Sequence, residues 1–181
     1  MAKRVAGWTL GLVFVGVGAF AQTPGTGIAA DLQRNYAQLK ANLTAAADLV
    51  AEADYGFKVG STPEARTYGQ LFGHIANAQF GECAGAKQVA NPNQGTNLEQ
   101  LTTKTEFVKA LADSFAFCDD AFSSVSDQSA LEVLPGGRRG PHARATELYA
   151  LIAHSNEMYG TVAAYLRSRN IVPPSTANRG R

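Results

Sequence analysis

Apolar residues recur at intervals of three and four along most of the chain beyond residue 27, which is the spacing of one face of an α-helix. Capping boxes mark two of the expected helix starts, Thr67 with Gln70 and Thr103 with Glu106. No segment alternates apolar and polar residues, so we expect no β-strands. The pattern predicts four amphipathic helices, over residues 28–52, 67–86, 103–122 and 143–169.

Two of the connections between these helices are long and are not expected to form regular structure. One is the polar segment 91–96, and the other is the glycine- and proline-rich segment 134–141. Four helices with such connections predict an all-α fold, a four-helix bundle with long crossover connections. We place the bundle at residues 28–172, after a linker at 22–27 and before a flexible tail at 173–181.

The first 21 residues have the three parts of a secretory signal peptide. Lys3 and Arg4 form a positive head, residues 5–21 carry no charge, and Ala19 and Ala21 are the small residues that signal peptidase recognises. The uncharged run is shorter than the roughly 20 apolar residues that span a bilayer. We therefore expect cleavage after residue 21, a periplasmic or secreted protein, and no membrane anchor on the mature chain.

The charge balance and the cysteine count exclude several classes of protein. Sixteen Lys and Arg against fifteen Asp and Glu leave a net charge of +1, so there is no basic excess for nucleic acid. Two cysteines cannot build a disulfide framework or a zinc ribbon. Cys83 and Cys118 fall on neighbouring predicted helices, where they either form a disulfide or remain two buried thiols.

Two segments of the chain resemble the DinB-like family, and within it an exported subgroup. They are Arg66-Thr67-Tyr68-Gly69-Gln70-Leu71-Phe72-Gly73-His74-Ile75-Ala76 and His154-Ser155-Asn156-Glu157-Met158-Tyr159-Gly160. The resemblance implies a four-helix bundle, often a homodimer, that holds a divalent metal with three histidines. One of these histidines lies on the second helix and two lie four residues apart on the last. Known activities in the family include thiol-dependent transferases and isomerases.

The resemblance assigns His74 as the first metal ligand and His154 as the second. Position 158, where the third histidine is expected, holds Met158. Residues four apart on a helix share a face, so a histidine there would present a second imidazole to the same ion. Methionine is a soft thioether, which suits Cu(I) better than zinc or nickel. His142 lies in the glycine- and proline-rich connection, and we expect it to be an exposed loop residue.

These residues lead to three hypotheses about function. The first is an exported, degenerate DinB-like protein with an incomplete tri-histidine site, which acts as a small-molecule binding or structural module and has no metal cofactor. The second is a metal-dependent, thiol-using transferase or hydrolase of small molecules, with zinc or nickel bound by His74 and His154. The third is a Cu(I)-binding protein that uses His74, His154 and Met158. Met158 favours the first hypothesis.

Overall fold

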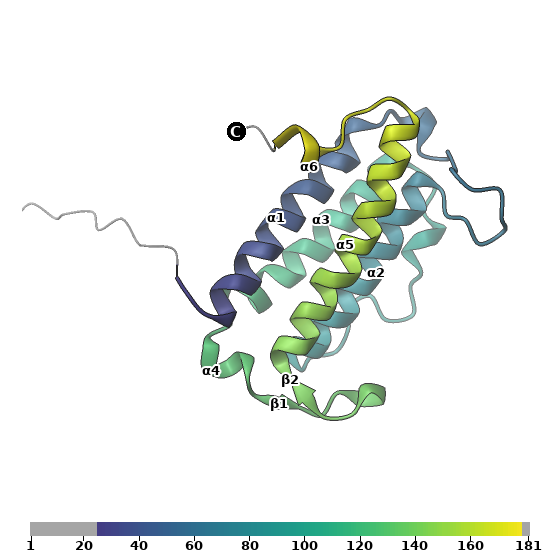
Figure 1. Ribbon diagram of the computed structural model, residues 1–181. Coiled ribbons are helices and arrows are strands. Elements are labelled where there is room, and N and C mark those ends of the chain that lie inside the picture. The colour runs from purple at the N-terminus through teal and green to yellow at the C-terminus, as the bar shows by residue number, and fades with distance from the viewer. Residues whose placement is uncertain (1–24, 179–181) are drawn as a thin grey trace, which may run out of the picture.

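The computed structural model describes residues 25–178, so the predicted signal peptide at residues 1–21 lies outside the described residues. Four long helices lie side by side in one bundle (Figure 1). They are α1 (Ile28–Leu49), α2 (Tyr68–Lys87), α3 (Lys104–Ser123) and α5 (Arg144–Ser168). The predicted all-α bundle is confirmed, and each helix begins within one residue of its expected start.

Local capping explains where α2 and α3 begin. The Thr67 hydroxyl oxygen accepts a hydrogen bond from the Gln70 backbone N–H at 3.1 Å, and the Gln70 side chain accepts one from the Thr67 N–H at 2.9 Å. Thr103 and Glu106 form the same reciprocal pair at the start of α3. Because the cap sets the first residue of α2, it also sets the helical phase at which His74 projects from that helix.

The connections contain short elements that the apolar spacing does not predict. They are η1 (Glu52–Asp54), η2 (Leu98–Gln100), α4 (Asp127–Ala130), η3 (Gly137–Arg139), β1 (Val133–Leu134) and β2 (His142–Ala143). The expectation of no strands is wrong, because β1 and β2 pair antiparallel with Val133 opposite Ala143. Each strand has two residues, which is too short for an alternating pattern to appear in the sequence. We call residues 131–143, which this pair closes, the hairpin.

Part of the segment that we expected to be a flexible tail is folded. Residues Pro174–Ala177 form the short helix α6, and Pro174 is buried. The Ser175 backbone N–H donates a hydrogen bond to the Tyr159 hydroxyl at 2.8 Å, which fixes α6 to α5. The flexible-tail prediction is therefore wrong for this part, because a proline at the helix start and a tyrosine acceptor order it. Residues 179–181 lie outside the described part of the chain.

The core lies between the four long helices, with α2 packed against α3 and α5, and α1 packed against the same two helices. Its largest fully buried side chains include Phe72, Phe115 and Phe122. Cys83 on α2 and Cys118 on α3 form a disulfide, with their Cα atoms 5.4 Å apart, which decides between the two alternatives that the sequence left open. None of the helices within residues 25–178 combines the length and the hydropathy needed to cross a membrane.

Candidate functional site around His74 and His154

The structure brings the first two predicted ligands together. His74 projects from α2 and His154 from α5, and their ring centroids lie 5.0 Å apart with an angle of 66° between the ring planes. Because α2 and α5 are joined only through a long stretch of intervening chain, this approach depends on the packing of the bundle. We call these two residues the histidine pair.

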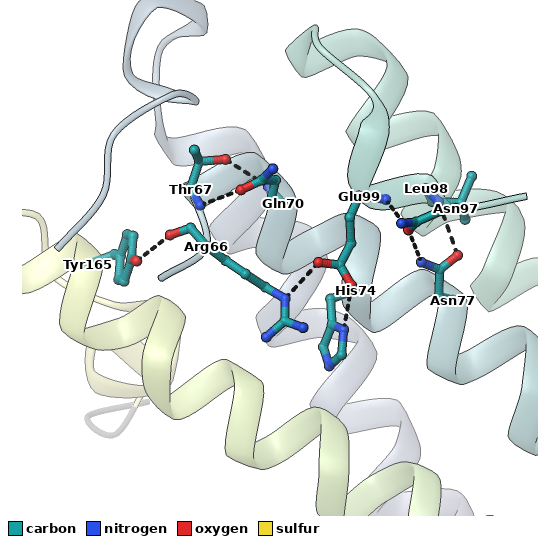
Figure 2. Close-up of polar contacts among 9 residues, drawn as sticks. All are labelled: Arg66, Thr67, Gln70, His74, Asn77, Asn97, Leu98, Glu99 and Tyr165. Atoms are coloured by element: carbon teal, nitrogen blue, oxygen red, sulfur yellow. Dashed lines mark hydrogen bonds and ion pairs between the residues drawn. The ribbon is translucent and has the colours of Figure 1, made fainter. Parts of the chain in front are cut away.

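A carboxylate that sequence reasoning missed orients the first imidazole. Glu99 lies in η2, and its Oε1 is 2.8 Å from His74 Nδ1, while its Oε2 accepts a hydrogen bond from Arg66 Nε at 2.8 Å (Figure 2). Burial raises the pKa of Glu99, but the hydrogen bonds and charges of Arg66 and His74 outweigh burial and lower it. An ionised carboxylate only accepts hydrogen bonds, so His74 carries a proton on Nδ1 and presents Nε2 to the surroundings.

Close packing of η2 against α2 places Glu99 beside His74. A Cβ added to Gly73 would lie 2.7 Å from the Leu98 carbonyl carbon and 2.9 Å from the Glu99 nitrogen, so only glycine allows this approach. Asn77, one turn along α2, accepts a hydrogen bond from the Leu98 N–H at 3.2 Å and donates one to Asn97 at 3.0 Å (Figure 2). Glycine and asparagine on one face of α2 therefore hold the connection that carries Glu99.

The second imidazole has a buried nitrogen without a hydrogen-bond partner among the described residues. This nitrogen is His154 Nε2. Burial lowers the pKa of His154, and the neighbouring His74 lowers it further. His154 is therefore neutral near pH 7. Its buried nitrogen is a polar atom without a partner, which is an uncommon feature of a folded protein and suggests a role in binding.

A cavity of about 590 Å³ lies beside α5, and its lining includes two neighbours of the histidine pair but neither histidine. Met158, one helical turn beyond His154, and Arg66, which holds Glu99, both line this cavity. Leu71 and Tyr165 are also in its wall, and the Tyr165 hydroxyl donates a hydrogen bond to the Arg66 carbonyl oxygen at 2.5 Å. Met158 is partly buried and packs against the core. The cavity therefore opens between α5 and the segment that leads into α2.

Comparison with known proteins gives one informative result. No protein-family model matches the sequence, and no curated protein matches it. A solved structure does match, that of a DinB-like protein from Bacillus cereus ATCC 10987, with a TM-score of 0.64 and 16% sequence identity over 79% of this chain and 93% of that one. This chain has a DinB-like fold. At this identity the likeness establishes the fold and nothing about activity.

Within the DinB-like fold, His142 is not where we expected it. The prediction of an exposed loop residue is wrong, because only 12% of its side chain is exposed. Its Nε2 is 2.7 Å from Glu147 Oε1, and its Nδ1 is 2.7 Å from the Gly140 carbonyl oxygen. It precedes α5, and the ten steps of helical rise from Arg144 to His154 span about 15 Å. His142 is thus held at the start of α5, whereas His154 lies near the middle of that helix.

The histidine pair supplies at most two of the ligands that a metal ion needs. The 5.0 Å between the ring centroids and the 66° between the ring planes are those of two rings packed edge to face. Within residues 25–178, no three His, Cys, Asp or Glu side chains are grouped so that they could hold a metal ion. Met158 occupies the position at which the family resemblance leads us to expect the third ligand, and it offers a thioether.

Proposed function

We propose that this protein is a binding module with a DinB-like fold that has lost the family's tri-histidine metal site, and that it binds a small amphipathic anion at the histidine pair and the adjoining cavity. The observation that carries the proposal is the cavity of about 590 Å³ with Arg66 in its wall. This volume falls within the range of small-molecule sites, which extends from about 300 to about 1,000 Å³.

The lining of the cavity supports an anion with an apolar body. Arg66 uses Nε to bind Glu99, and its guanidinium also has two terminal nitrogens that can donate to a carboxylate. Leu71, Ala164 and Met158 supply apolar surface for the rest of the molecule. Glu157 is also in the lining but is exposed to solvent, where its charge is screened.

The histidine pair would then recognise the ligand through hydrogen bonds. His74 presents Nε2, and His154 is neutral with a buried Nε2 that lacks a partner. A polar group that enters between the rings would satisfy the buried nitrogen, whose desolvation is otherwise uncompensated. This arrangement supports binding without a third ligand at position 158.

Calorimetric titration with octanoate tests this proposal. We expect octanoate to bind the mature chain from residue 22, and to bind the Arg66→Gln variant at least about tenfold more weakly, because a charge-assisted hydrogen bond is worth roughly 1.5 to 3 kcal/mol. Arg34→Gln is the matched control, since Arg34 lies on α1 and pairs with Asp31 on the surface. Equal affinity in all three proteins, or no binding to any of them, would refute the proposal.

A second candidate function, metal binding, is favoured by the contact between Glu99 and His74. A carboxylate on one nitrogen of a histidine commonly orients the other nitrogen toward a metal. His74 and His154 would hold the ion, and Met158 would favour Cu(I) over zinc or nickel. A bound divalent ion would supply Lewis acidity to a transferase or hydrolase.

Metal analysis of the mature chain purified without an affinity tag separates the candidates. Stoichiometric zinc or nickel would support the metal-dependent enzyme and refute the binding module. Copper bound only under reducing conditions would support the site formed by His74, His154 and Met158. A metal-free protein in which Met158→His creates zinc binding would support the binding module, because the variant restores the missing ligand.

A further inference from the structure

Four charged or titratable side chains meet beneath the hairpin, and neither histidine of the pair is among them. Arg139 on η3 donates to both oxygens of Glu82 on α2, at 2.7 and 2.8 Å, and to Glu147 Oε2 on α5 at 2.9 Å. His142 on β2 contacts the other oxygen of Glu147 at 2.7 Å. We call Glu82, Arg139, His142 and Glu147 the hairpin cluster. Two of its members belong to the bundle and two to the hairpin, so it fastens one to the other.

The geometry of His142 determines how many protons the cluster holds. A carbonyl oxygen can only accept, so the 2.7 Å contact with Gly140 places a proton on His142 Nδ1. The contact between Nε2 and Glu147 then needs one more proton, which lies either on the ring as imidazolium or on the carboxyl as the neutral acid. Without this proton, a nitrogen lone pair would face a carboxylate oxygen at hydrogen-bond distance.

The shared proton also makes the cluster electrically neutral. Two carboxylates contribute two negative charges, and the Arg139 guanidinium and the shared proton contribute one positive charge each. Only 10% of the Glu147 side chain is exposed, so a net charge there is costly. Losing the proton would leave one uncompensated negative charge beneath the hairpin.

We propose that the hairpin cluster is a one-proton latch, which holds the hairpin on the bundle while His142 and Glu147 share a proton and releases it when rising pH removes that proton. The hairpin has little regular structure of its own to hold it in place: its two strands have two residues each, and Gly136, Gly137 and Gly140 adopt positive φ angles. Release would separate Arg139 and His142 from α2 and α5.

The surroundings of Glu147 raise its pKa, which agrees with release of the hairpin as pH rises. Burial raises the pKa of Glu147, and Glu82 raises it further, against the opposite effects of His142 and Arg139. A carboxyl whose folded pKa is raised contributes stability below its unfolded pKa of about 4.5, and this stability is lost as pH rises through the folded value.

The pKa of the neighbouring Glu82 shifts in the opposite direction, downward. Burial raises the pKa of Glu82, but the hydrogen bonds and charge of Arg139, the neighbouring Glu147 carboxyl and the charge of His154, further along α5, together lower it. Glu82 is therefore an anion in the same pH range and keeps its pair with Arg139. The change at rising pH thus belongs to the pair formed by His142 and Glu147.

Nitrogen-15 NMR of the imidazole groups in the mature chain tests the latch directly, since the whole sequence has three histidines. We expect His142 Nδ1 to be protonated from pH 5 upward, and the backbone amide signals of Gly136, Gly137 and Gly140 to shift with the midpoint at which the shared proton is lost. An unprotonated Nδ1, a proton retained up to pH 10, or glycine signals that do not follow the midpoint would each overturn the proposal.

Tryptic cleavage at Arg138 and Arg139 provides a second measurement. In Glu147→Gln the amide N–H can donate to a neutral His142, so this variant should keep the hairpin closed at alkaline pH. The ratio of the wild-type cleavage rate to the Glu147→Gln rate, which cancels the pH dependence of trypsin, should rise by up to about tenfold per pH unit, the slope for one proton.

A matched control isolates the shared proton from other charges near the hairpin. Glu132 is exposed and pairs with Arg144 at 2.8 Å, outside the hairpin cluster. The Glu132→Gln variant should show the same rise relative to Glu147→Gln as the wild type does. A ratio that stays constant with pH, or a Glu132→Gln variant that behaves like Glu147→Gln, would overturn the latch.

Discussion

Removing the disulfide between Cys83 and Cys118 should lower the stability of the bundle by about 4 kcal/mol. The bond closes a loop with a sequence separation of 35 residues between α2 and α3. For a loop of this length, the loss of chain entropy in the unfolded state is about 13 cal/mol/K, which is about 4 kcal/mol at 25 °C. Native domains of this size are stable by only about 5 to 15 kcal/mol, so the effect is a large share of the total.

Urea unfolding followed by far-ultraviolet circular dichroism measures this difference, because the only tryptophan of the sequence, Trp8, lies in the predicted signal peptide. We compare the oxidised mature chain with the same chain after reduction in denaturant, which keeps both sulfur atoms in place. With a slope of about 2 kcal/mol per molar urea, the midpoint should fall by about 2 M.

The Cys83→Ala/Cys118→Ala double variant is the control for the reductant. Its midpoint should be the same with and without reducing agent, because it has no disulfide to lose. A reduced wild type within about 1 kcal/mol of the oxidised protein would refute the entropic argument. Two free thiols in the denatured protein before reduction would show that the bond does not form.

Three further predictions concern the histidine pair. Gly73→Ala should destabilise the protein by about 1 to 3 kcal/mol, because η2 must move away from the added Cβ. The control Gly81→Ala has open space around its Cβ and should be neutral or stabilising by up to about 1 kcal/mol. Equal urea midpoints for the two variants would refute this prediction. Burial and His74 lower the pKa of His154, so the stability that neutral His154 contributes is lost as pH falls below 6.5 through the folded pKa. His154→Gln should therefore flatten the acid limb of a profile of unfolding free energy against pH. An unchanged acid limb would contradict this prediction. Glu99→Gln should lower the free energy of unfolding by about 1 kcal/mol at pH 7, measured by urea unfolding. Glu157 is exposed, so the control Glu157→Gln should leave the free energy of unfolding unchanged. Similar losses for both variants would refute the role of Glu99.

Features that depend on neighbouring residues were predicted well from the sequence. The starts of α2 and α3 follow from side chains three residues apart, and both capping boxes are present as expected. The four apolar faces follow from helical spacing, so the DinB-like bundle was also within reach. In these cases the interacting groups are close in the chain, and the pattern contains the whole interaction.

The family resemblance paired the distant residues His74 and His154, but the contacts that Glu99 and His142 make with residues of other elements were missed. Glu99 lies in a short polar connection, and nothing in its own surroundings in the sequence links it to His74, which is 25 positions earlier. The available signal was Gly73 in the interior of a predicted helix, since such a glycine can indicate close approach of another backbone. His142 was placed in an exposed loop for the same reason, because its partner Glu147 is brought into place by the packing of α5 against α2.

The disulfide also determines which parts of the histidine pair can move against each other. It joins α2 to α3, so His74 belongs to a covalently braced pair of helices, and η2 with Glu99 lies in the connection between them. His154 and Met158 lie on α5, which apart from the main chain is held to that pair by packing and by the polar contacts of Arg139 and Tyr165, not by a covalent cross-link. The disulfide therefore fixes the half of the histidine pair that carries His74 and Glu99, and the position of His154 relative to that half depends on noncovalent contacts alone.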